Sequence, residues 1–204
     1  MPDSANRKTV DEALLTSLTD LVRAHPDATV RSYFEQLQDW GSEWRHVEAS
    51  WLPAAERLPE LHAFADAGCE TLLALFAQHA SQLFWEQSYR REDGLVGDDM
   101  LAGYGFSEVI GKRGPFVSTR VRSGIGIWGP QIDYPIHRHE AEEIYVVMSG
   151  EAEFTVGGET ATRKSGDVVH VTSMTPHGFS THEQSLAVFY LWRAGDLRET
   201  SSFD

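Results

Sequence analysis

Residues 137–150 read HRHEAEEIYVVMSG, in which two histidines and three glutamates precede an apolar, strand-like segment. Because side chains alternate with a period of two along an extended strand, His137 and His139 point to the same side. After a short bend, Glu143 begins a second strand, and a further histidine, His177, follows the next turn signals downstream. Three imidazoles and one carboxylate suit a divalent transition metal that keeps coordination positions open for a substrate. The sequence therefore predicts a metal site made by His137, His139, Glu143 and His177.

The same stretch resembles the first cupin motif, in which His-x-His is followed by Glu and then by Gly. The match runs from His137 to Gly150 without a gap, although Gln131 stands where the motif has an earlier Gly. Downstream, Gly166 and His177 match the second cupin motif. The resemblance implies an antiparallel β-barrel of the cupin (jelly-roll) type, with His177 as its fourth metal ligand. Three residues replace the Pro, Gly and Asn of the second motif: Thr172, Met174 and Thr181.

The composition limits the kinds of molecule that this protein is expected to bind. With 17 Lys and Arg against 31 Asp and Glu in 204 residues, the formal charge is −14, whereas nucleic acids and anionic membranes attract basic proteins. Cys69 is the only cysteine, which excludes an intrachain disulfide and fits a reducing compartment. No stretch approaches the length of a transmembrane helix. We therefore expect a cytoplasmic protein with a small-molecule substrate and with neither nucleic-acid nor membrane partners; its oligomeric state, including a homodimer, stays open.

The chain divides into two regions that differ in the pattern of their residue types. Residues 1–112 predict a helical N-terminal region with a connecting loop, because apolar residues recur three and four positions apart up to about residue 90. Residues 113–204 predict a cupin barrel with the metal site, because Gly, Val, Thr and aromatic residues alternate between closely spaced turn signals. The glycine-rich residues 90–112 read as an irregular connection, and whether it acts as a lid stays open. The expected fold class is α+β.

Four helices are expected in the first region. A capping box that starts at Thr9 predicts the first helix. Thr29 predicts the N-terminus of a second helix that reaches Leu37, and apolar periodicity predicts two more over residues 53–64 and 69–89. These apolar stripes are typical of a packed core rather than of a binding site.

Two tyrosines lie close to the predicted ligands along the chain. Tyr145 follows Glu143 by two residues, so its ring faces the same side of the strand as the carboxylate. A nearby divalent cation lowers the pKa of a phenol, which would let Tyr145 act as a base near neutral pH. Tyr134 precedes His137 by three residues and could hydrogen-bond a substrate. Aromatic packing is the alternative interpretation for both residues.

The last strand contributes further aromatic candidates for substrate binding. Tyr190 and Trp192 share one face, and their rings could attract a cationic group through cation–π interactions. Whether Tyr190 and Trp128 line the site stays open, because core packing accounts for them equally well. The barrel has few basic residues, so we expect the metal to anchor a substrate carboxylate. The most obvious basic candidates are Arg120, Arg122, Arg138 and Lys164.

The helical region followed by one cupin resembles the cupin-type dimethylsulfoniopropionate (DMSP) lyases of the DddQ and DddL kinds. The residues that carry this resemblance are Tyr134, His137, His139, Glu143, Tyr145, His177 and Trp192. It covers the cupin half by motif and the helical half only by layout. The resemblance implies a carbon–sulfur lyase that splits DMSP into acrylate and dimethyl sulfide, with Tyr145 initiating a β-elimination and Tyr134 assisting. It also implies that Trp192, Tyr190 and Tyr134 bind the substrate.

Two other functions remain open on the sequence alone. An iron-dependent cupin dioxygenase of a small thiol or carboxylate would use the same ligands and would require O₂. A non-catalytic ligand-binding cupin is a further alternative, although the first region has no clear DNA-binding signature. The metal also stays open among Fe(II), Mn(II), Zn(II), Co(II) and Ni(II), because mixed His/Glu sites accept all of them.

Overall fold

The computed structural model describes residues 4–36, 43–193, 197 and 202–203. Its first part is helical, and no helix among the described residues is both long and apolar enough to cross a membrane. The α-helices are α1 (Ser4–Ala24), α2 (Ala28–Gln36), α3 (Leu58–Ala63), α4 (Glu70–His79) and α5 (Asp98–Gly103). Short 3-10 helices are η1 (Pro53–Arg57), η2 (Ala80–Gln82) and η3 (Arg91–Asp93).

Two sheets of mainly antiparallel strands follow. The first has the order β2-β1-β3-β10-β5-β8, with strands β2 (Phe116–Val117), β1 (Tyr104–Gly111), β3 (Val121–Trp128), β10 (Leu186–Arg193), β5 (Glu142–Ser149) and β8 (Val168–Val171). The second has the order β11-β4-β9-β6-β7, with strands β11 (Ser202–Phe203), β4 (Asp133–Arg138), β9 (His177–Thr181), β6 (Glu151–Val156) and β7 (Glu159–Lys164). The sheets are separate in hydrogen bonding, so they do not close into a barrel.

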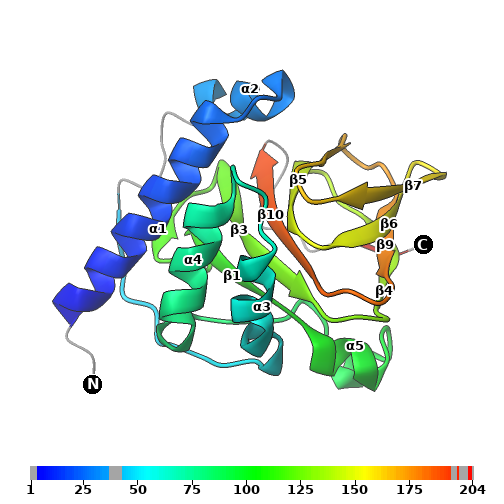
Figure 1. The fold of residues 1–204 in the computed structure, drawn as a ribbon, viewed down its shortest axis with the longest axis horizontal. Helices are drawn as coiled ribbons and strands as arrows, with labels where there is room; N and C mark the ends of the chain where they lie inside the picture. The colour runs from blue at the N-terminus through cyan, green and yellow to red at the C-terminus, as the bar shows by residue number, and fades with distance from the viewer. Residues whose placement is uncertain (1–3, 37–42, 194–196, 198–201, 204) are drawn as a thin grey trace.

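The first sheet lies between the helices and the second sheet (Figure 1). One of its faces packs against α1, α3 and α4, and this core includes Leu18, Phe76 and Phe189. Its other face packs toward the second sheet, with Tyr190 on the first sheet and Phe179 on the second. The alternation along β10 places Tyr190 and Trp192 between the sheets, where functional side chains from both sheets meet.

The predicted fold class, a helical region followed by a cupin-like antiparallel assembly, is confirmed, but details differ. α1 begins at Ser4, so Thr9 lies inside the helix, where its hydroxyl donates to the Ala5 carbonyl at 3.1 Å instead of capping the N-terminus. α2 is capped by Asp27, whose carboxylate accepts the Thr29 backbone N–H at 2.6 Å. Leu37 lies outside the described residues.

The segment 90–112 is more regular than its glycines suggest. It contains η3, α5 and all of β1, and β1 pairs with β3 through six residue pairs. The glycines at positions 103, 105 and 111 suggested a loop, but β1 is formed by its pairing with β3, which the local pattern did not reveal. The division at residue 112 stays a prediction, although β1 already belongs to the first sheet.

Candidate metal centre and active site

Three histidines converge between the two sheets. His137 lies on β4 directly opposite His177 at the start of β9, and His139 follows β4. All three are buried, and one ring nitrogen from each lies within 4.8 Å of those of the other two. The pairing of β4 with β9 therefore brings together ligands that are about forty residues apart in the sequence.

The remaining nitrogen of each ring fixes the orientation of the imidazole. Each Nδ1–H donates to a main-chain carbonyl two residues away, at 2.8–2.9 Å. This arrangement leaves Nε2 as the ligand atom, as is usual for metal-binding histidines. The buried Nε2 of His177 has no hydrogen-bond partner among the described residues, so this donor set fits a metal ion. The carbonyl acceptors belong to Pro135 for His137, Ala141 for His139 and Thr175 for His177.

Glu143 supplies a buried carboxylate at the same place. Its Oε2 lies 2.9 Å from His139 Nε2 and 3.4 Å from His177 Nε2. Burial alone would raise the pKa of Glu143, but the adjacent His139 and His177 rings hold it well below its usual range. The charged carboxylate that a metal needs is therefore available at neutral pH.

His137 is held in the neutral form that a ligand requires. Burial and the nearby His177 ring lower its pKa to about 3. The imidazole therefore keeps a lone pair free over the physiological pH range.

A cavity of about 270 Å³ opens beside these ligands. It is lined by most of the residues that the sequence predicted for the site and by Trp128, whereas His139 and His177 lie behind its surface. The predicted residues are Tyr134, His137, Glu143, Tyr145, Tyr190 and Trp192. The residues that sequence reasoning did not place there are Ser88, Tyr89, Asp93, Leu95, Tyr104, Phe106, Arg113 and Arg122.

The two candidate tyrosines have different polar neighbours. The Tyr145 hydroxyl donates to the Glu143 carboxylate, and burial together with this negative charge raises its pKa well above the ordinary value of 10.0. Burial likewise raises the pKa of Tyr134, whose hydroxyl interacts with that of Tyr89. The Tyr134 ring also packs edge-on against His137, at 5.0 Å between ring centroids. Tyr145 thus interacts with the Glu143 carboxylate, and Tyr134 with the cavity wall.

The Trp192 ring contacts one imidazole and one guanidinium group. The His139 imidazole stacks on it at 4.0 Å between centroids, and the Arg122 guanidinium lies 5.0 Å from its ring centre. Trp192 nevertheless lines the cavity, so its role in substrate binding stays a prediction. The indole N–H is buried and has no partner among the described residues.

Arg122 lines the cavity, but the sequence analysis did not assign it to the site. It forms an ion pair with Glu108 at 2.5 Å, and the Glu108 side chain is fully buried. Next to it, Arg113 pairs with Glu86, also at 2.5 Å. One feature of the sequence could have identified Arg122: it is the single charged residue in the strand 121–128. It also pairs with Trp192 in the neighbouring strand, so the two side chains lie on the same face.

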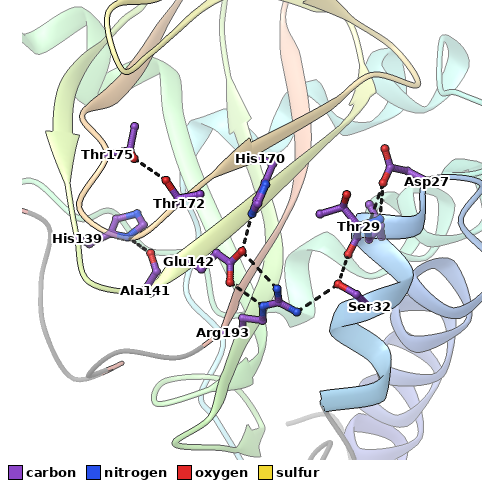
Figure 2. A network of polar contacts seen from close by, with 11 residues as sticks. Asp27, Thr29, Ser32, His139, Ala141, Glu142, His170, Thr172, Thr175 and Arg193 are labelled. Carbon is purple, nitrogen blue, oxygen red and sulfur yellow. Dashed lines mark hydrogen bonds and ion pairs between the residues drawn. The ribbon is translucent and has the colours of Figure 1, made fainter.

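A polar network holds the start of β5 next to the metal ligands (Figure 2). Arg193 on β10 binds both oxygens of Glu142 at 2.8 and 3.3 Å and reaches Ser32 on α2 at 3.2 Å. His170 on β8 lies 2.6 Å from the same carboxylate, and the Arg193 guanidinium covers the Tyr33 ring at 3.7 Å. His170 thus points away from the cavity, as its position in the strand predicts.

Comparisons with known proteins point to one family. The model of the dimethylsulfoniopropionate lyase family matches residues 25–188. The chain is 34% identical over 114 residues to the dimethylsulfoniopropionate lyase DddQ of Ruegeria pomeroyi, an alignment that covers 55% of each protein. It is 32% identical over 75 residues to a putative dimethylsulfoniopropionate lyase DddL of Cereibacter sphaeroides, covering 36% of this chain and 31% of that protein. The matched regions therefore span about half and about a third of these two relatives.

The structural matches cover nearly the whole chain. A chain in the crystal structures of the DMSP lyases RdDddP and RnDddQII gives a TM-score of 0.83 at 26% identity, covering 97% of this chain and 99% of that one. The DMSP lyase DddQ from Ruegeria pomeroyi gives 0.82 at 24% identity, covering 96% of both chains. The helical region and both sheets therefore form one arrangement that these proteins share.

Proposed function

Because this chain belongs to the dimethylsulfoniopropionate lyase family, we propose that it is a metal-dependent carbon–sulfur lyase that cleaves DMSP to acrylate and dimethyl sulfide. The observation that carries this proposal is the buried ligand group beside Tyr145. Three imidazoles turn Nε2 toward one point, and Glu143 joins them while it accepts a hydrogen bond from the phenol. A base and a metal site are thereby coupled in one cavity.

We assign the four ligands to His137, His139, Glu143 and His177. A divalent cation held by them would supply positive charge that lowers the pKa of a neighbouring phenol. Mixed His and Glu donors accept Fe(II), Mn(II), Zn(II), Co(II) and Ni(II), so the donor set leaves the identity of the metal open.

We assign the role of general base to Tyr145. Its phenolate would remove a proton from the carbon next to the substrate carboxylate. The electron pair of that C–H bond forms the C=C bond of acrylate, and the C–S bond breaks so that dimethyl sulfide leaves with its electrons. Dimethyl sulfide is a neutral leaving group, so no general acid is required, and the proton remains on Tyr145 until it is lost to solvent.

The cavity walls would orient the substrate. Tyr134 lies beside His137 and would steady the substrate within reach of Tyr145. Trp192 and Tyr190 form the wall on β10 and limit the space to a small molecule. Trp192 and Tyr190 would face the sulfonium, and the aromatic side chains around Tyr134, which include Tyr89 and Trp128, would add further rings to the same cavity.

Anaerobic turnover tests this function. Purified protein is reconstituted separately with each of the five metals and incubated with DMSP in the absence of O₂. We expect dimethyl sulfide in the headspace and acrylate in solution in equal amounts. No release with any metal, or release only after O₂ is admitted, would reject the elimination and favour an iron-dependent dioxygenase.

A further inference from the structure

A second cleft opens next to the active-site cavity, and its wall is rich in basic side chains. Its volume is about 730 Å³, and four of the chain's 17 Lys and Arg residues line it, although the formal charge of the chain is −14. The cleft shares Ser88 and Arg113 with the cavity, so the two spaces are neighbours. We call it the basic cleft. Its charged residues are Arg45, Glu48, Glu86, Arg90, Lys112 and Arg113.

Two cations of the basic cleft have no carboxylate partner among the described residues. The Arg45 guanidinium donates only to main-chain carbonyls, from Nε to Gly114 at 3.0 Å and from Nη2 to Lys112 at 2.5 Å. These contacts hold the guanidinium beside the main chain of Lys112. The Lys112 ammonium is exposed and has no partner in the part of the chain that the structure describes. Two unpaired positive charges therefore come from adjacent points of one wall, an arrangement that attracts a small anion.

The two carboxylates of the basic cleft do not neutralise these charges, because each already has another partner. Glu86 pairs with Arg113 at 2.5 Å, and Glu48 lies 3.1 Å from the His46 imidazole. The two unpaired cations therefore set the sign of the local field. A concave surface lined by one sign of charge concentrates ions of the opposite sign, even on a protein whose net charge would repel them.

Arg113 lies where the basic cleft meets the cavity. Its backbone N–H donates to the buried Glu108 carboxylate at 2.6 Å, which fixes the turn that carries it. Of its guanidinium, only Nη1 is engaged, by Glu86, and the other nitrogens have no partner among the described residues. Because Arg113 lines both spaces and Lys112 only the cleft, an anion that leaves the cavity on this side reaches Arg113 first and Lys112 next.

We infer that the basic cleft binds a small carboxylate, and that during turnover this carboxylate is the acrylate product as it leaves the cavity. The identity of the carboxylate rests on the proposed function. The substrate carboxylate belongs at the metal ligand group, so the cleft acts only after the C–S bond has broken. Dimethyl sulfide is neutral and acrylate carries one negative charge, so the cleft attracts only one of the two products.

Titration of the zinc-loaded, isotope-labelled chain with sodium acrylate tests this inference. Acrylate replaces sodium chloride at constant ionic strength, and two-dimensional amide NMR spectra follow the cleft and the ligand group separately. We expect the amide signals of Val47, Lys112 and Arg113 to shift with one dissociation constant. Lys112→Glu should weaken this binding roughly fivefold, because it replaces an exposed attraction by a repulsion. Lys164→Glu is the matched control, since Lys164 is an exposed lysine on β7 and the change in net charge is the same; it should bind acrylate as the wild type does.

A variant without the metal site separates the two places where acrylate could bind. His177→Ala should lose acrylate-dependent shifts around the ligand group and keep those at the basic cleft, and its amide spectrum also checks its fold. Shifts confined to the ligand group in the wild type, or equal weakening by Lys112→Glu and Lys164→Glu, would reject the carboxylate site. Dimethyl sulfide release without any shift at the cleft would reject the site and leave the proposed function standing. Lys112-dependent binding in a protein that releases no dimethyl sulfide from DMSP would support the site and reject the proposed function.

Discussion

The hydrogen bond between Tyr145 and Glu143 makes the phenol a poor base until positive charge is placed beside it. Burial and the carboxylate both raise the pKa of the phenol, whereas a cation bound by the same carboxylate opposes both effects. The proposed role of Tyr145 as the base therefore requires the metal, and substitutions can test the base and the metal separately.

Tyr145→Phe removes the hydroxyl and keeps the ring. We expect the turnover rate with DMSP to fall by roughly 10²–10⁴-fold, the usual contribution of a general base. Headspace gas chromatography measures the rate of dimethyl sulfide release, and inductively coupled plasma mass spectrometry checks that the metal content is unchanged. Tyr134→Phe is the matched comparison and should act mainly on KM. Turnover by Tyr145→Phe at the wild-type rate would assign the base elsewhere.

His177→Ala removes a proposed metal ligand, whose Nε2 has no hydrogen-bond partner among the described residues. We expect the bound metal and dimethyl sulfide release to be lost together, because the site then has at most three of its donors. His170→Ala is the matched control: His170 binds Glu142 on the far side of β5 and should retain full metal content. Equal metal content in the two variants would show that His177 is not a ligand.

Among elements, the junction of α2 with β5, β8 and β10 depends on one ion pair. Arg193 bridges Ser32 on α2 and Glu142 on β5, so the helical layer is tied to the strand that carries Glu143 (Figure 2). Arg193→Met leaves the half-buried Glu142 with His170 alone, and we expect the free energy of unfolding to fall by roughly 1–3 kcal/mol. Arg91→Met, which breaks an exposed pair with Asp98, should cost less than about 1 kcal/mol in the same urea titration. Equal losses would contradict a special role for the buried pair.

The same pair predicts a pH dependence. The hydrogen bond from Arg193, followed by that from His170, lowers the pKa of Glu142 below its ordinary value of 4.5. A lowered folded-state pKa contributes stability that is fully present above the unfolded-state pKa and is lost as the pH falls through the folded-state value. The difference in unfolding free energy between the wild type and Glu142→Gln should therefore be largest above about pH 4.5 and shrink below it. A constant difference between pH 7 and pH 3 would exclude this contribution.

The turn between β5 and β6 explains the Gly at the end of the first cupin motif. Gly150 has φ +82°, and a Cβ there would overlap the Ser185 carbonyl oxygen. Gly158 has a similar φ of +88° but open space around it, so Gly158→Ala isolates the backbone strain, roughly 1–2 kcal/mol. We expect Gly150→Ala to lose a further 1–3 kcal/mol, roughly, because the carbonyl must move. Equal melting temperatures for the two variants would mean that the overlap is relieved without cost.

Local spacing predicted the site residues whose geometry is itself local. The period of two placed Tyr145 with Glu143 and Tyr190 with Trp192, since each pair lies on one strand. Arg122 was left outside the site, because its inward position depends on the pairing of β3 with β10 and its partner Glu108 lies on β1. Pairing between strands that are far apart in sequence has no short-range signature, so this end of the cavity could not be predicted.

At the scale of the molecule, the helices and the first sheet share one core. Leu14 and Leu18 of α1, Phe76 of α4 and Ile125 of β3 belong to the same buried cluster. The sheet thus has one face covered by helices and one by the second sheet (Figure 1), and neither face is stable in water alone.

Because the helices and the first sheet share this core, we expect the chain to unfold as one unit. The change in residue pattern near residue 112 should not mark a separate unfolding unit. A fragment of residues 113–204 would lack β1, which exposes an edge of β3, and would also lose the helices that cover Ile125 and Phe189. We expect that fragment to give a poorly dispersed NMR spectrum, whereas the full chain shows a single calorimetric transition with equal calorimetric and van't Hoff enthalpies. A well-dispersed fragment spectrum, or two separate transitions in the full chain, would instead mean that the sheets form a domain that folds without the helices. The ion pair in the cavity wall depends on this outcome, because Glu108 and Arg122 come from β1 and β3, on opposite sides of the boundary at residue 112.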